Sequence, residues 1–133
     1  MASEDLRSEK KPIARIHFTQ MSWATGDGHA AQTATAYVNG IIERIDIIIS
    51  SVTGNPTVNV SWADLNSVVL LPAMSSLADG TKHIKYGLSN KGTQDADFNP
   101  VPHCGNITVT ADPSADPGGT GQTLTVDVIL YVR

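Results

Sequence analysis

A single cysteine, Cys104, stands among the 133 residues of this sequence, which excludes an internal disulfide and any metal site built from several cysteines. Charge is also scarce, because charged residues make up 17% of the chain and the net charge is −4. The basic stripe that marks a protein bound to duplex nucleic acid is absent. We therefore expect no nucleic-acid partner.

Long hydrophobic runs are missing as well. No run approaches the roughly 18 apolar residues that a membrane-spanning helix needs. The N-terminal residues MASEDLRSEKKP are charged and lack the apolar segment of a secretory signal. We therefore expect no membrane partner, and no targeting segment indicates where the protein resides.

Helical periodicity is nearly absent, because no window of about a dozen residues repeats apolar positions at spacings of three and four. The chain is instead rich in Thr, Val and Ile, interrupted at short intervals by Gly, Pro, Asn and Asp. This pattern is typical of strands joined by turns. We expect an N-terminal arm over residues 1–12 and one all-β domain over residues 13–133. That domain is expected to be an antiparallel, jelly-roll-like β-sandwich of about eight strands.

The expected strands follow runs of alternating apolar and polar residues. Asn39-Gly40 lies between two such runs, and Asn-Gly is the strongest short-range signal of a two-residue hairpin. A long irregular loop is expected over residues 89–103. Alternation places Val58, Val60 and Trp62 in the core, together with every second residue from Leu124 to Val132. The strands are expected at residues 13–23, 32–38, 41–50, 58–62, 67–71, 83–88, 105–110 and 123–132.

Residues able to carry catalysis or bind a metal are scattered. His103 and Cys104 are adjacent, and an extended chain directs adjacent side chains to opposite faces, so they are poorly placed to act as base and nucleophile. No histidine pair has the HxH or HxxxH spacing that zinc sites often use. Asp112 and Asp116 lie in a Pro/Gly-rich loop that matches no calcium-binding pattern, and turn chemistry explains them. We expect no enzyme activity and no cofactor or metal, with a histidine site between subunits and a calcium loop kept as alternatives.

Aromatic residues are only 5% of the chain, which leaves little material for a sugar-binding surface. Trp62 shares its face with valines and is expected in the core. Trp23, Phe98 and Tyr131 are the aromatic residues that we consider as exposed candidates.

Four segments resemble a pattern found in small virion proteins of tailed phages, the head decoration or cement proteins. They are Ile42–Ile49, the turn and strand Thr53–Val60, the strand Gly105–Thr110, and the terminal strand Leu124–Tyr131. The resemblance covers about residues 40–133. It lies in strand and turn motifs that include no catalytic motif, so no catalytic residue carries over. It implies a β-sandwich that binds a capsid lattice, with the arm or loops bridging neighbours.

The favoured function is therefore a non-enzymatic capsid decoration protein in the virion, assembled in the cytoplasm of the bacterial host. Its expected partners are the major capsid protein or another virion protein, and further copies of itself as a dimer or trimer. An outward Ile129 and Tyr131 need cover, either at a subunit interface or under a loop. A receptor- or glycan-binding module of a tail or fibre is the alternative, and a small hydrolase using Cys104 or a histidine is a third hypothesis. The candidate contact residues are Arg7, Lys10, Lys11, Pro12, Asp112, Asp116, Ile129 and Tyr131.

Overall fold

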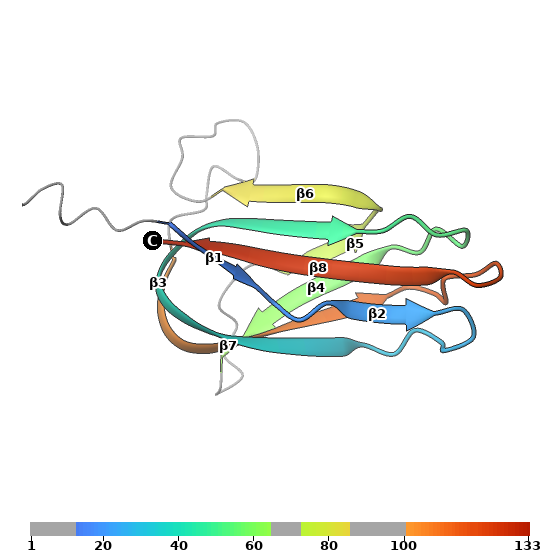
Figure 1. Cartoon of the computed structure of the whole chain (residues 1–133), viewed down its shortest axis with the longest axis horizontal. Coiled ribbons are helices and arrows are strands. Elements are labelled where there is room, and N and C mark those ends of the chain that lie inside the picture. The colour runs from blue at the N-terminus through green and yellow to red at the C-terminus, as the bar shows by residue number, and fades with distance from the viewer. Residues whose placement is uncertain (1–12, 65–72, 86–100) are drawn as a thin grey trace, which may run out of the picture.

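The computed structural model describes residues 13–64, 73–85 and 101–133 of the chain, and the structural statements below concern these residues. They form an all-β fold in which every pair of neighbouring strands is antiparallel (Figure 1). The fold class expected from the sequence is confirmed. The eight strands are β1 (Ala14–His17), β2 (Met21–Ala24), β3 (Gln32–Ile49), β4 (Val58–Ala63), β5 (Met74–Leu77), β6 (Gly80–Lys85), β7 (Val101–Pro113) and β8 (Thr123–Val132).

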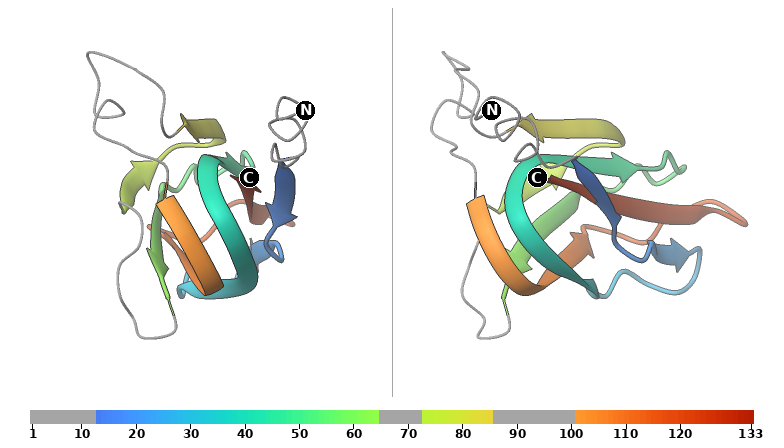
Figure 2. Two further views of the ribbon diagram at one scale, coloured as in Figure 1. Left: turned by 90° about the vertical axis from the view of Figure 1, so that its left-hand side faces the viewer. Right: turned by 60° about the vertical axis from the view of Figure 1, so that its left-hand side comes forward.

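One long strand, β3, organises the whole sheet. Its first half, residues 32–42, pairs with β7, and its second half pairs with β8 on one side and β6 on the other. Because β3 and β7 bend together, the sheet curls into two facing layers (Figure 2). One layer holds the first half of β3 with β7, β4 and β5, and the other holds the second half of β3 with β6, β8, β1 and β2.

The expected hairpin at Asn39-Gly40 is wrong, because β3 runs through both residues without interruption. Gly40 has a φ of +146°, and the chain bends there instead of reversing. The backbone at the C-terminus passes so close that a Cβ on Gly40 would lie 2.6 Å from the carbonyl oxygen of Arg133. Glycine is therefore needed at position 40, because the backbone of Arg133 approaches the bent strand there too closely for a side chain.

Other strand predictions differ from the structure in extent. The strand expected over residues 13–23 is two strands, β1 and β2, which both pair with β8. The last part of the expected loop over 89–103 is strand, since β7 begins at Val101. The turn at Thr53–Pro56 is confirmed by Asn55, which has a φ of +50°. The expected strand at 67–71, and residues 86–100, lie outside the described residues.

The core lies between the two layers and follows the predicted alternation. Along β8, Leu124, Val126, Val128, Leu130 and Val132 are all buried. Val58, Val60 and Trp62 are buried from the facing layer, as expected. Phe18, between β1 and β2, meets Trp62 edge to face with ring centroids 6.1 Å apart, which joins the two layers.

A side chain closes the gap between β2 and the start of β3. The amide of Gln32 accepts a hydrogen bond from the Ser22 backbone N–H (3.1 Å) and donates one to the Ser22 carbonyl (2.6 Å). These two bonds replace those that a neighbouring strand would make, because they satisfy the N–H and the carbonyl of Ser22 in β2. The two layers are thereby fastened along one side.

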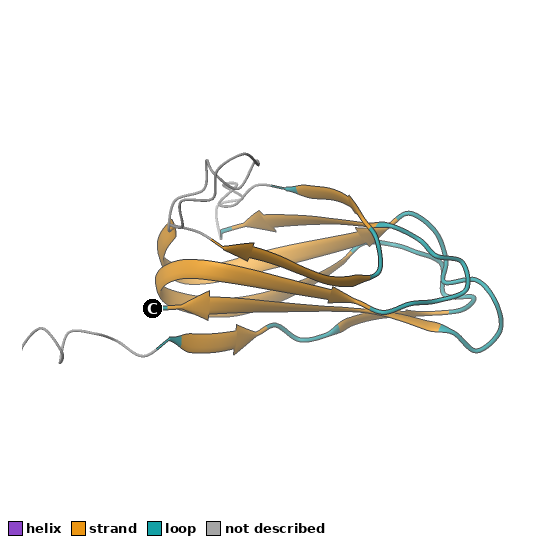
Figure 3. Ribbon diagram, turned by 90° about the horizontal axis from the view of Figure 1, so that it is seen from above, coloured by secondary structure: helices purple, strands orange, loops and turns teal. Residues whose placement is uncertain are grey.

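The domain is elongated, and its two ends differ. The connections β2–β3, β3–β4 and β7–β8 gather at one end (Figure 3). The β3–β7 bend, the start of β1 and the C-terminus lie at the other. The chain therefore enters the domain, at Ile13, opposite the gathered loops.

Candidate functional site

Three connections between strands are joined by hydrogen bonds at one end of the domain. They comprise residues 25–29, 53–57 and 113–122, and we call them the loop cluster. Asp116 lies at its centre. One carboxylate oxygen accepts hydrogen bonds from the backbone N–H groups of Gly26 (3.0 Å) and Gly28 (3.1 Å), and the other accepts one from Gly118 (2.9 Å). These bonds, that from Gly118 most of all, hold the pKa of Asp116 below its ordinary value.

Further bonds cross the loop cluster. The Thr25 hydroxyl donates to the carbonyl of Gly118 (2.9 Å) and accepts from the N–H of Gln122 (3.0 Å). The N–H of Gly54 donates to the Pro117 carbonyl, which ties the third loop to the other two. Loops pinned in this way have little conformational freedom left to lose on binding.

The two aspartates of the Pro/Gly-rich loop have different surroundings. Both oxygens of Asp116 already accept backbone N–H groups, and Asp112 belongs to β7, where it pairs with Asn59 of β4. Within the described ranges, no group of three or more His, Cys, Asp or Glu side chains is placed to hold a metal ion. Asp116 thus joins the turns around it through three backbone hydrogen bonds.

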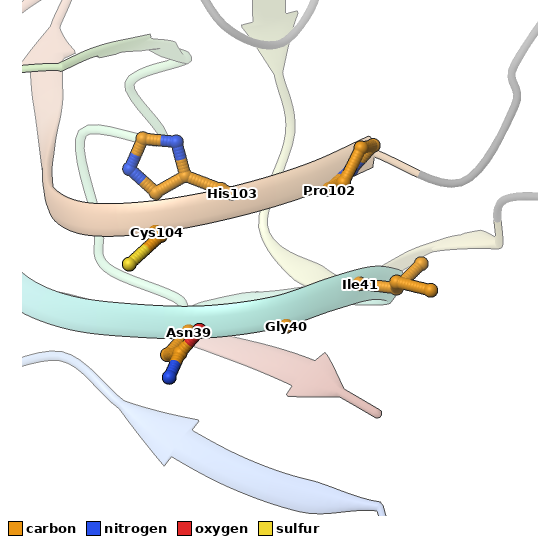
Figure 4. Close-up of a pocket in the computed structure, with 6 residues that line it drawn as sticks. All are labelled: Asn39, Gly40, Ile41, Pro102, His103 and Cys104. Atoms are coloured by element: carbon orange, nitrogen blue, oxygen red, sulfur yellow. The ribbon is translucent and has the colours of Figure 1, made fainter.

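A second feature lies at the opposite end, where β3 and β7 bend. An open depression of about 400 Å³ is lined by Asn39, Gly40, Ile41, Pro102, His103 and Cys104 (Figure 4). Beside it, the phenol oxygen of Tyr37 lies 3.4 Å from the Cys104 sulfur. The hydrogen bond to the Cys104 thiol raises the pKa of Tyr37. Tyr37 is 61% exposed, the highest value among the large hydrophobic residues described.

His103 and Cys104 point to opposite sides of β7, as the sequence predicts (Figure 4). In the register with β3, His103 faces Gly40 and Cys104 faces Asn39. Because Asn39 is exposed and Val38 is buried, the thiol belongs to the outer face and the imidazole to the inner one. The two groups do not converge on a common substrate position, which a nucleophile and its base must do.

The outer face of the other layer carries the remaining predicted contact residues. Ile129 is only 2% exposed, so burial, and not an exposed interface, is the interpretation that the structure supports. Tyr131 is partly buried beneath Arg44, whose guanidinium carbon lies 4.7 Å from the ring centroid. Arg44 also binds the buried Asp46 through two bonds of 2.8 Å. Neither Ile129 nor Tyr131 is a free apolar patch.

The remaining predictions concern the N-terminal arm, the exposed aromatic candidates and membrane-spanning segments. Arg7, Lys10, Lys11 and Pro12 lie outside the described residues. Trp23, considered as an exposed aromatic, is buried at 2% and donates its indole N–H to the Ala30 carbonyl (2.7 Å). Among the described residues, no helix is long and apolar enough to span a membrane.

Sequence reasoning missed Tyr37 as a surface residue. The signal was present, because the run Thr33-Ala-Thr35-Ala-Tyr37 alternates polar and small residues with a period of two. That alternation places Tyr37 on the same face as the two threonines, away from the core.

Comparison with known proteins adds a distant likeness only. No protein-family model matches the sequence, and no curated protein is significantly similar to it. PliG, a periplasmic inhibitor of g-type lysozyme from Aeromonas hydrophila, shares 10% identity over 91% of this chain and 86% of its own, with a TM-score of 0.43. The VP2 subviral particle of infectious bursal disease virus shares 11% identity over 94% of this chain, with a TM-score of 0.39. A structure of the Gt strain of that virus gives 12% identity and the same TM-score of 0.39.

The chain spans only 34% of each matched viral chain. These likenesses concern a jelly-roll-like β-fold and include a distant one to a viral capsid protein. They say nothing of what this chain binds, because unrelated functions share such folds.

Proposed function

We propose that the protein is a non-enzymatic accessory protein of a phage particle that binds and stabilises the head lattice. The observation that carries the proposal is that the loop cluster and the start of the domain lie at opposite ends. A pre-organised loop cluster, fastened by Asp116, lies at one end, and the chain enters at Ile13 at the other. A rigid body with a separate attachment at each end is suited to bridging neighbouring capsomers.

The exposed chemistry of the loop cluster agrees with a protein partner of this kind. Its exposed residues are small or uncharged, apart from Asp27 and the titratable His29, and include Thr53, Asn55, Ser114 and Thr120. Such a surface binds through shape and hydrogen bonds, and its rigidity lowers the entropic cost of docking. Many copies on a repeating lattice then strengthen a weak single contact through multivalency.

The proposed partners are the major capsid protein or another virion protein and further copies of this chain, as a dimer or trimer. The proposed location is the virion, after assembly in the cytoplasm of the bacterial host. Neither nucleic acid nor a membrane is a proposed partner. The alternative function, a receptor- or glycan-binding module of a tail or fibre, is favoured by one observation, the exposed ring of Tyr37.

The test is whether the protein raises the thermal stability of phage heads that were assembled without it. Wild-type protein, a form lacking residues 1–12 and the variant Asp116→Ala are each added to such heads, and head disruption is followed on heating. Thr120→Ser, a substitution at an exposed residue of the loop cluster that takes no part in the Asp116 bonds, is the matched control. We expect stabilisation by wild type and the control, and a weaker effect from the other two. Heads that melt at the same temperature with and without wild-type protein would contradict the proposal.

A further inference from the structure

The outer face of the layer formed by the first half of β3, β7 and β4 is almost free of charge. We call it the neutral face. Its members are set by strand alternation and by the register that pairs Thr35 with Thr108 and Asn39 with Cys104. Asp112, at the end nearest the loop cluster, is its one charged side chain among the described residues. The neutral face comprises Thr33, Thr35, Tyr37, Asn39, Ile41, Pro102, Cys104, Asn106, Thr108, Thr110, Asp112, Asn59, Ser61 and Ala63.

Charge is concentrated on the opposite layer. Register places Arg15, Tyr131 and Arg44 in one row across β1, β8 and β3. The next rows hold His17 and Asp127, joined at 3.0 Å. Depletion of charge on one face, with an exposed aromatic residue midway along one of its strands, is a compositional feature of binding surfaces.

The side chain of Tyr37 is tilted toward the surface of the neutral face and does not project perpendicular to the sheet. Directly across the register it pairs with Asn106, yet its phenol oxygen is 3.4 Å from the sulfur of Cys104, two positions further along β7. A tyrosine standing perpendicular to the sheet would carry its oxygen well above a short cysteine side chain. The ring is therefore tilted over the sheet, with one face toward solvent, in agreement with its 61% exposure.

Uncharged hydrogen-bonding groups flank the ring. On one side, the hydroxyls of Thr35 and Thr108 lie 2.9 Å apart. On the other side, Asn39 and Cys104 border the depression at the bend. An exposed aromatic ring with hydroxyl and amide groups beside it offers a ligand both a stacking surface and hydrogen-bond partners.

We propose that the neutral face binds an uncharged polysaccharide, with one sugar ring stacked on Tyr37. The C–H bonds on one side of a sugar ring carry slight positive charge and are attracted to the negative face of an aromatic ring. The hydroxyls of the neighbouring sugars meet Asn39, Thr35 and Thr108, which can both donate and accept. The absence of Lys and Arg from the face among the described residues selects a neutral chain over an acidic one.

The size of the face favours such a ligand over a second copy of the protein. β3 and β7 contribute about ten residues each and β4 contributes six, and at about 3.3 Å per residue with strands about 4.8 Å apart they cover on the order of 400 Å². A stable protein interface buries about 800 Å² on each partner. A polysaccharide lying along the strands needs only the strip around Tyr37. This proposal does not rest on capsid binding, and its failure would leave that function untouched.

The test uses the full-length protein in affinity gel electrophoresis with soluble dextran, mannan, galactan and laminarin, and with alginate as an acidic comparison. We expect at least one neutral polysaccharide to retard wild type, with binding weakened about tenfold or more in Tyr37→Ala and nearly unchanged in Tyr37→Phe. Arg15→Ala, on the opposite layer, is the matched control and should bind as wild type does. No retardation by any neutral polysaccharide, or equal retardation of Tyr37→Ala, would overturn the proposal.

A second measurement on wild-type protein removes any dependence on the folding of the variant. Cys104 is the single cysteine and is exposed beside Tyr37, so its rate of alkylation reports on this face alone. A saturating amount of the retarding polysaccharide should slow alkylation several-fold. An unchanged rate would mean that the sugar binds elsewhere and would refute the assignment. A Tyr37-dependent rise in solution mass without any retardation would likewise refute it, in favour of a subunit contact.

Discussion

Replacing Gly40 with alanine is expected to destabilise the domain strongly, because the bend of β3 leaves no room for a Cβ. The added atom would lie 2.6 Å from the carbonyl oxygen of Arg133 and 2.7 Å from a methyl carbon of Val132. Overpacking of this kind costs about 1–3 kcal/mol. The φ of +146° adds about 1 kcal/mol, because a side chain disfavours positive φ.

A total near 3 kcal/mol corresponds to a fall in Tm of about 10 °C for a domain of this size. Thermal unfolding followed by circular dichroism measures it. Gly121→Ala is the matched control, since Gly121 has a φ of +66° with nothing within 4 Å, and only the backbone cost of about 1 kcal/mol applies. The double variant Gly40→Ala/Val132→Ala should lose less stability than the sum of the two single losses, because one of the atoms that overlap the added Cβ is gone. If Gly40→Ala costs no more than Gly121→Ala, the reasoning about the bend is refuted.

Three further predictions concern other parts of the fold. The lowered pKa of Asp116 means that its carboxylate stabilises the fold above the unfolded pKa of about 4, and this stabilisation is lost as the pH falls through the folded pKa. The urea midpoints of wild type and Asp116→Asn should therefore differ at pH 7, and the difference should shrink as the pH falls below the folded pKa. Gln32→Ala should cost about 1–2 kcal/mol by removing both bonds to Ser22, with faster amide exchange at Ser22 and unchanged exchange in β8 as the check. Deleting residues 124–133 should abolish cooperative unfolding, because β8 pairs with β1, β2 and β3, and a retained sharp transition would contradict this.

Local alternation predicted the parts of the fold that depend on burial alone. Leu124 to Val132 and Val58 to Trp62 have their apolar residues in the core as expected, since a period-two pattern fixes which face is buried. The opposite orientation of His103 and Cys104 follows from the same rule. The alternation of Thr33, Thr35 and Tyr37 would have identified the neutral face had it been applied to Tyr37.

Features set by distant contacts were beyond local reasoning. Asn39-Gly40 reads as a hairpin within its own segment, and only the passage of the C-terminal backbone, more than 90 residues away in the chain, makes it a bend. Asp116 is a turn residue in the sequence, and its contact with Gly26 and Gly28 depends on how β2 and β8 pair. Ile129 alternates as an outward residue, yet it is buried in the folded chain.

Cosedimentation of the purified full-length protein with phage heads assembled without it tests the central claim most directly. The account predicts saturable binding, with a fixed number of copies for each capsomer and a loss of affinity when residues 1–12 are removed. Protein that stays in the supernatant at every concentration, while pelleting with whole bacterial cells, would contradict the capsid function and favour a receptor-binding module.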